Sequence, residues 1–352
     1  MTVTIIARHE LSKAGCDDNG TCCVDQTQTI CDHTESLLRN LSSVNLRRSR
    51  SINNNEFKQE RVEPNEDDDD DKYRRLFCFD EAPEYLKHNV YIRNGYRGML
   101  NTKLCMESIF WWTNETINIW SHVFGFMLFL GLTLKDSVYI DIQAPWEDKV
   151  LVANVLVCFQ VCMILSSLYH TFSCRSEKDF NCFLTFDLFG IALSLLAIYT
   201  SGIYYAFWCE QYWRTFYMFT VSLIFAGAML LQLPKFNISS NVKTLVFILW
   251  ALYGVIPTIH WTIRSGGLAS PVVRLLLPRV MGMYGISGLA FLVYITKIPE
   301  RFFAGKFDYF GHSHQWWHII IVMALYYWHS SGILYLEYRM NHACPGMESS
   351  SS

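Results

Sequence analysis

Seven long apolar runs between positions 117 and 336 constrain the fold of this chain more than any other feature of its sequence. Each run comes near the roughly 20 residues that an α-helix needs to cross a lipid bilayer. Pro257, near the end of the fifth run, should bend or end that helix. The runs are Ile117–Leu134, Val150–Phe172, Cys182–Trp208, Thr215–Leu233, Thr244–Ile263, Val280–Thr296 and Trp316–Leu336.

Composition favours a membrane protein over a large soluble one. Charged residues make up 17% of the chain, below the quarter that is usual in soluble domains, and 51% of the residues are hydrophobic. Buried helices of a soluble protein are the alternative, but seven runs with almost no charge disfavour it. We therefore predict an all-α fold, a seven-helix transmembrane bundle over residues 115–338, followed by a short C-terminal tail at 339–352.

The first 72 residues differ sharply from the rest. They are polar, contain the basic stretch NLRRSRS and the acidic block NEDDDDDK, and lack a continuous apolar run. This composition predicts a disordered cytosolic tail over residues 1–72, joined to the bundle by a juxtamembrane cytosolic segment over 73–114. The net charge of −3 and the lack of a nucleotide-binding loop give no reason to expect nucleic acid as a partner.

The distribution of basic residues predicts the orientation in the membrane. Lys and Arg close to the bilayer are more numerous on the side that the N-terminus shares with the loops after the second, fourth and sixth runs. The positive-inside rule therefore places the N-terminus in the cytosol. All the glycosylation sequons fall on that side, so we expect them to stay unmodified: Asn19, Asn40, Asn114 and Asn237.

Three histidines are placed so that they can share one metal ion. His170 ends the second run and His314 and His318 begin the seventh, so alternation of the spans brings them to the same membrane face. His314 and His318 are spaced i, i+4, which puts their Cβ atoms roughly 5–6 Å apart on one helical face. Asp187 lies at a similar depth, a lone carboxylate within FLTFDLFGIALSLL. Ionisable groups inside a membrane need a common explanation, and the pattern predicts a zinc site.

A simpler explanation exists for part of this pattern. The stretch HSHQWWH could form an interfacial belt of His and Trp side chains at headgroup level, with His312 as a loop or interfacial residue. That belt does not account for the buried carboxylate. The other membrane histidines serve as controls: His329 lies about 16 Å beyond His318 along a helix, and His260 lies near the opposite face. We interpret His122 as a packing or hydrogen-bonding residue.

The number of protein ligands predicts whether the zinc could take part in catalysis. Three protein ligands leave one tetrahedral position open, as in catalytic zinc sites. A water there would have its pKa lowered to about 7 and could attack an amide or ester carbonyl. Asp187 is the natural acceptor for the proton of that water, and Ser166, one turn before His170, could hold the water or donate to an oxyanion. A closed scaffold with the same ligands would have an identical sequence pattern.

The motifs together resemble a known family. The combination of NETINIWSH, the SxxxH of SSLYH, the Asp of FDLFG and the HxxxH of SHQWWH is similar to the progestin and adipoQ receptor family, which includes the adiponectin receptors. The resemblance implies seven membrane helices with a cytosolic N-terminus. It also implies zinc ligation by His170, His314 and His318, with Asp187 near the bound water.

Further stretches narrow the resemblance to a Golgi-resident member that tethers Raf kinase. They include YIRNGYRG, YGVIPTIHW and KIPERFFAGKFDYFG, and the similarity spans roughly residues 73–340. It implies a Golgi membrane protein that captures Raf kinase on its cytosolic side and dampens signalling to MEK and ERK. Residues 1–72 have no counterpart there, so the segment expected to contact the kinase is Tyr73–Gly98. An amphipathic interfacial helix that caps the bundle is the alternative for that segment.

Two classes of function remain open at this point. One is a zinc-braced scaffold or receptor that binds a signalling protein, or a hormone of the adiponectin type. The other is a zinc-dependent lipid amidase, because the same SxxxH, Asp and HxxxH pattern occurs in alkaline ceramidases and related membrane hydrolases. The second function would require membrane lipids, with a sphingolipid bound inside the helix bundle.

Overall fold

The computed structural model describes residues 74–139, 144–232, 236, 238–342 and 344. The predicted tail over residues 1–72 lies outside the described residues, as does most of the predicted C-terminal tail. The described residues belong to one unit, Asn65–Ser352.

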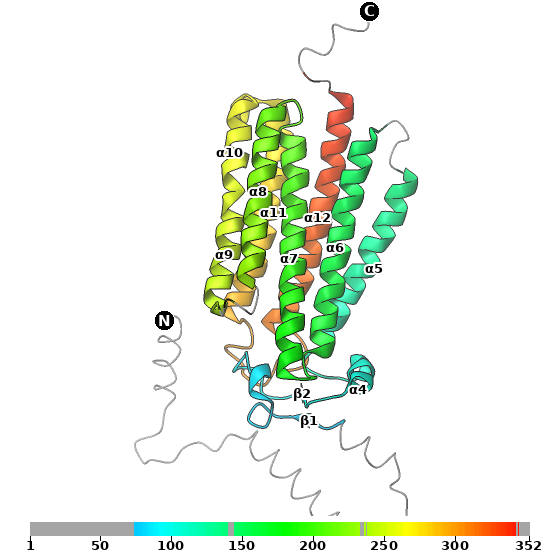
Figure 1. Ribbon diagram of the computed structural model, residues 1–352, viewed down its shortest axis with the longest axis vertical. Coiled ribbons are helices and arrows are strands. Elements are labelled where there is room, and N and C mark those ends of the chain that lie inside the picture. The colour runs from blue at the N-terminus through cyan, green and yellow to red at the C-terminus, as the bar shows by residue number, and fades with distance from the viewer. Residues whose placement is uncertain (1–73, 140–143, 233–235, 237, 343, 345–352) are drawn as a thin grey trace, which may run out of the picture. The chain divides into compact units, whose positions relative to one another are not determined.

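Seven helices are long and apolar enough to cross a membrane, which confirms the predicted all-α bundle. The helices lie side by side, and α12 packs against α5, α6, α7 and α11 (Figure 1). Their bounds are α5 Thr116–Tyr139, α6 Trp146–Phe172, α7 Glu177–Ala206, α8 Gln211–Gln232, α9 Ser240–Tyr253 continued by α10 Val255–Arg264, α11 Pro271–Thr296 and α12 Ser313–Asn341.

One helix begins far outside its predicted limit, and another is interrupted where a proline predicted a break. Helix α11 begins nine residues before the predicted Val280, because Pro271 occupies its first position and the helix continues through Pro278. The fifth span breaks at Gly254, three residues before Pro257, as the proline predicted. The hydroxyl of Tyr199 donates to the Trp250 carbonyl at 2.6 Å, which satisfies a backbone group freed by the break.

Close contact between α6 and α7 aligns the residues around the site. A Cβ atom on Gly190 of α7 would lie 2.9 Å from the Cα atom of Cys162 in α6, so only glycine allows the two backbones to approach this closely. Ser166 lies one turn beyond Cys162, and Asp187 lies about one turn before Gly190, in the direction of the same end of the bundle. The contact therefore places these two side chains opposite each other.

A small irregular cap covers the end of the bundle where α6 ends and α12 begins (Figure 1). We define the cap as residues 74–115 together with the loop 297–312 between α11 and α12. It contains the antiparallel strands β1 (Leu76–Phe77) and β2 (Tyr96–Arg97), the short α-helix α4 (Thr102–Glu107), and the 3-10 helices η2 (Glu84–Leu86) and η3 (Ser108–Phe110). Residues 74–98, all described, contain no α-helix, so the alternative prediction of an amphipathic helix there is wrong. Gly95, at φ 87°, turns the chain back toward the bundle instead.

Hydrogen bonds between distant segments fix the cap. The carboxylate of Asp308 accepts from the backbone N–H of Arg93 at 2.8 Å and from the amide of Asn94 at 2.9 Å. Glu300 accepts from the Asn89 amide at 3.1 Å. The stretches YIRNGYRG and KIPERFFAGKFDYFG, which carried part of the family resemblance, are therefore partners of one another. At the opposite end of the bundle, a disulfide joins Cys209, after α7, to Cys344, after α12.

Candidate metal centre

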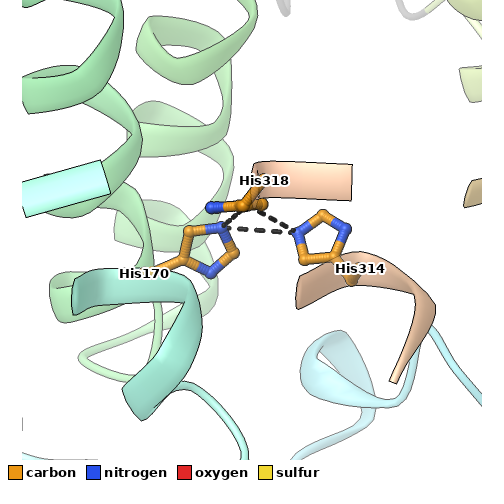
Figure 2. A group of neighbouring side chains, drawn as sticks. All are labelled: His170, His314 and His318. Atoms are coloured by element: carbon orange, nitrogen blue, oxygen red, sulfur yellow. Dashed lines mark hydrogen bonds between the residues drawn. The ribbon is translucent and has the colours of Figure 1, made fainter. Parts of the chain in front are cut away.

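The three predicted ligands meet at the capped end of the bundle. His170 lies in the last turn of α6, and His314 and His318 lie in the first two turns of α12. Their Nε2 atoms face one another, at 3.1 Å between His170 and His318, 3.4 Å between His170 and His314, and 3.3 Å between His314 and His318 (Figure 2). His170 and His318 are buried and His314 is half-buried.

These separations fit a tetrahedral ion. Zinc–nitrogen bonds of about 2.0–2.1 Å at tetrahedral angles place two ligand nitrogens about 3.3 Å apart. Among the described residues, these three histidines are the potential metal ligands that lie close enough together to share an ion. Their ligand atoms all lie within 4.8 Å of one another. The donor set and its spacing therefore fit zinc. With three protein ligands, a fourth position would remain for water or substrate.

A carboxylate behind the first ligand sets its orientation. The Nδ1 atom of His170 lies 2.7 Å from Oε2 of Glu115, and the same oxygen accepts from the Asn118 amide at 2.7 Å. A histidine that donates its Nδ1–H to a carboxylate presents Nε2 to the metal. Burial alone would raise the pKa of Glu115, but the His170 ring, its hydrogen bond and the Arg97 charge hold that pKa well below its usual range.

The sequence analysis missed Glu115 as a functional residue. It lies within NETINIWSH, immediately before the first apolar run, where a carboxylate resembles an ordinary solvated loop residue. Two further residues of that motif contact His318: Ser121 Oγ lies 3.4 Å from its Nδ1 atom, and the His122 ring stacks on it with centroids 3.9 Å apart. The prediction of His122 as a packing residue agrees with this position.

Charged side chains of the cap hold the two helix ends that carry the ligands. Arg97, which is 2% exposed, donates to the backbone carbonyls of His170 and Thr171 at the C-terminus of α6. Glu300, which is fully buried, accepts from the backbone N–H and hydroxyl of Ser313 at the N-terminus of α12. A cation at a helix C-terminus and an anion at an N-terminus are the signs that the helix dipoles favour.

Asp187 and Ser166 lie beside the triad. Both Ser166 and His170 lie near enough to the Asp187 carboxylate to favour its charged form. Asp187 is not part of the close ligand group among the described residues. The catalytic roles of these two residues stay predictions.

The control histidines occupy separate places. His312 precedes α12 as its N-cap residue, with its Nε2 atom 3.2 Å from the Asn114 carbonyl oxygen, and it is buried rather than interfacial. His329 contacts Asp136 of α5 at 2.6 Å, and His260 contacts Tyr217 at 3.0 Å. None of the three joins the described ligand group.

The fold and the site define a class: a seven-helix membrane protein with a three-histidine centre inside one end of its bundle. Residues 110–329 match the haemolysin-III related family. The human protein named progestin and adipoQ receptor family member 3 is 43% identical over 277 residues, which cover 77% of this chain and 89% of the relative. The Drosophila melanogaster adiponectin receptor protein is 31% identical over 252 residues, which cover 70% of this chain and 56% of the relative. The chain belongs to the progestin and adipoQ receptor family.

Proposed function

We propose that this chain is a zinc-containing Golgi membrane protein that tethers Raf kinase through its cytosolic cap and dampens signalling from Raf to MEK and ERK. The observation that carries the scaffold function is the attachment of the cap to the helix ends that carry the three histidines. Arg97 and Glu300 connect the cap to α6 and α12 beside the three histidines. A metal at the triad would thus hold in place a rigid surface for a partner.

The exposed residues of the cap narrow the predicted kinase contact. Within the segment first expected to bind, Ile92, Tyr96 and Arg97 are buried in the cap and cannot reach a partner. Val90 of that segment is exposed at 48%, and Met99, the residue that follows the segment, is exposed at 67%, so these two are the candidates for an apolar contact with the kinase.

Capture of Raf kinase tests this function. Full-length protein in detergent should retain purified Raf kinase, and the double variant Val90→Asp, Met99→Asp should retain at least about tenfold less, a loss of about 1.4 kcal/mol or more. The matched control is Leu268→Asp, an equally exposed leucine at the opposite end of the bundle, which should leave capture unchanged. Failure of the unmodified chain to capture the kinase would overturn the scaffold function.

The disulfide supports the proposed orientation. Disulfides form and persist in oxidising compartments, so the end that carries Cys209 and Cys344 is expected to face the Golgi lumen. The cap then faces the cytosol together with the N-terminus. Asn114, one of the sequons on that side, is only 6% exposed, which is consistent with an unmodified residue. An N-terminal epitope tag that is accessible after selective permeabilisation of the plasma membrane, in Golgi-marked cells, would agree with both proposals.

A lipid amidase is the second candidate, because the bundle contains an apolar cavity. The cavity has a volume of about 140 Å³ and lies between α7, α10, α11 and α12, with Leu195, Ser287 and Trp328 among its lining residues. Trp328 is ten residues beyond His318, about 15 Å along α12. A dry cavity of about 150 Å³ holds a benzene-sized molecule, so this one fits part of an acyl chain.

The residues suggest how such an amidase would work. Bound zinc would supply activation of water as the nucleophile. Asp187 would take up the proton, and Ser166 would keep the Asp187 carboxylate oriented through its hydrogen bond. Purified protein should then hydrolyse a ceramide, and Asp187→Ala should abolish hydrolysis while zinc content is retained. Absence of hydrolysis by the unmodified, zinc-loaded protein would eliminate this candidate.

A further inference from the structure

Two cysteines from distant parts of the chain meet inside the cap. Cys105 belongs to α4 and Cys174 follows the last turn of α6, and their Sγ atoms lie 3.6 Å apart. Both side chains are almost completely buried, at 0% and 1% exposure, in the apolar cluster that holds the cap on the bundle. A contraction of about 1.6 Å would bring the sulfurs to bonding distance, since a disulfide spans about 2.0 Å.

The two thiols are not equivalent. The hydrogen bond from Cys105 lowers the pKa of Cys174 to about 7, with a further contribution from the Arg97 charge, while burial opposes the shift. The same hydrogen bond raises the pKa of Cys105, with burial adding to the effect. Cys174 is therefore the more acidic of the two sulfurs and the one that would attack an oxidant. A thiolate of this kind beside an arginine is a reactive one.

Simple packing is the competing explanation, because buried cysteines often behave as small apolar residues. Packing alone requires neither the pairing of two thiols nor a neighbouring guanidinium. Arg97 is held in this position by bonds to Ser108 Oγ at 2.7 Å and to the Thr171 carbonyl at 3.0 Å. A cysteine of lowered pKa next to a second, resolving cysteine is one feature of redox-sensitive pairs, although this pair is more deeply buried than most.

We propose that Cys105 and Cys174 form a peroxide-sensitive dithiol that, when oxidised, covalently fastens α4 of the cap to the end of α6. The oxidant is hydrogen peroxide, which would have to enter by a local opening of the cap because both sulfurs are buried. The Cys174 thiolate attacks one peroxide oxygen, so that an S–O bond forms, the O–O bond breaks and hydroxide leaves to be protonated to water. The Cys105 sulfur then displaces the resulting sulfenic oxygen, which leaves as a second water as the S–S bond forms. The two thiols lose two electrons in total, and the peroxide gains them.

The bond would change how freely the cap moves. Cys105 and Cys174 are 69 residues apart in the sequence, and a crosslink that closes such a loop stabilises mainly by restricting the unfolded chain. Cytosolic disulfides are usually transient and redox-sensing, so reducing conditions would restore the free thiols. Oxidation of the pair would thus join α4 of the cap covalently to the end of α6, and reduction would leave the two held only by non-covalent contacts. This does not depend on whether the cap binds a kinase.

Peptide mapping after peroxide treatment tests the proposal. Purified full-length protein in detergent is exposed to hydrogen peroxide, digested without reduction and analysed by mass spectrometry. We expect a Cys105–Cys174 crosslinked peptide that dithiothreitol removes, and a thermal unfolding midpoint that rises by several degrees on oxidation. Neither change should occur in Cys105→Ser or Cys174→Ser, and both should persist in Cys182→Ser, which removes an exposed cysteine of α7.

The unmodified protein keeps the test decisive even if a serine variant fails to fold. Oxidation of Cys174 to a sulfinic or sulfonic acid without a crosslink would overturn the proposal. So would a peroxide-treated protein in which Cys182 is oxidised and the Cys105–Cys174 pair stays reduced.

Discussion

The two ends of the bundle handle buried charge in different ways. At the disulfide end, the buried ionisable side chains form separate pairs: His329 contacts Asp136 at 2.6 Å, and Arg339 pairs with the fully buried Asp148. At the capped end, one histidine also has an acidic partner, since His170 Nδ1 contacts Glu115, but the Nε2 atoms of all three histidines converge on one point. An acid–base pair satisfies both of its members, whereas three imidazole nitrogens that converge on one point have the geometry of a shared metal site.

Removal of the converging histidines should have the largest effect. The variant His314→Ala, His318→Ala should lower the zinc content from one ion per chain to none, because a single histidine remains. The free energy of unfolding should fall by several kcal/mol, since the binding of structural zinc can add about 10 kcal/mol to folding stability. Elemental analysis and thermal unfolding measure the two effects.

His260→Gln is the control for that double variant, since His260 contacts Tyr217 away from the triad. Its zinc content should equal that of the unmodified chain. One zinc per chain in the double variant would contradict the ligand assignment.

Disruption of a pair at the disulfide end should cost stability without loss of metal. His329→Leu leaves the Asp136 carboxylate buried without its partner, which should lower the free energy of unfolding by about 3–5 kcal/mol. Denaturation measured beside zinc analysis separates the two quantities. Loss of zinc in this variant would show that the two ends are not independent.

Neutralising the Glu115 carboxylate, which contacts His170, should have an intermediate effect on zinc affinity. Glu115→Gln keeps the shape of the side chain but removes the charge, so zinc affinity should fall by about 10–100-fold. Competition with a chelator of known affinity measures the change. Glu107→Gln, a surface carboxylate of α4 near Arg74 and Lys103, serves as control and should leave the affinity unchanged.

A substitution that disturbs the contact between α6 and α7 should have the smallest effect on the free energy of unfolding. Gly190→Ala places a Cβ atom 2.9 Å from the Cys162 Cα atom, so the helices must separate at a cost of about 1–3 kcal/mol. Gly227→Ala, where no atom lies within 4 Å of the new Cβ, should instead stabilise α8 by about 0.5–1 kcal/mol. Equal effects of the two changes on thermal unfolding would exclude close packing as the role of Gly190.

The difference between the two ends also explains what the sequence could predict. The helices were predictable because a lipid environment demands continuous apolar runs, and the His314–His318 pair because helical spacing places both on one face. The limit of α11 was missed because Arg274, Pro278 and Arg279 interrupt its apolar run. Local patterns of this kind carry little information about partners that are distant in sequence.

Contacts between distant residues were therefore not predicted. Asn89 and Glu300 are 211 residues apart, and Glu115 and His170 are 55 apart, so neither pair has a local sequence signal. The cap was misjudged as a possible amphipathic helix because its polar residues point inward to such partners. The disulfide between Cys209 and Cys344 was likewise not recognised among scattered cysteines.

The opposite charges of Arg97 and Glu300 have a thermodynamic consequence. Arg97 hydrogen-bonds the end of α6 and Glu300 the start of α12, the two helices that carry the three histidines. A displacement of the cap would therefore change the distances among the three imidazoles. Coupled binding equilibria are reciprocal. If a partner that binds the cap changes the affinity of the three histidines for an ion by some factor, the ion must change the affinity of the cap for that partner by the same factor. Binding of an ion at the three histidines and binding of a partner at the cap would therefore be linked by one coupling free energy.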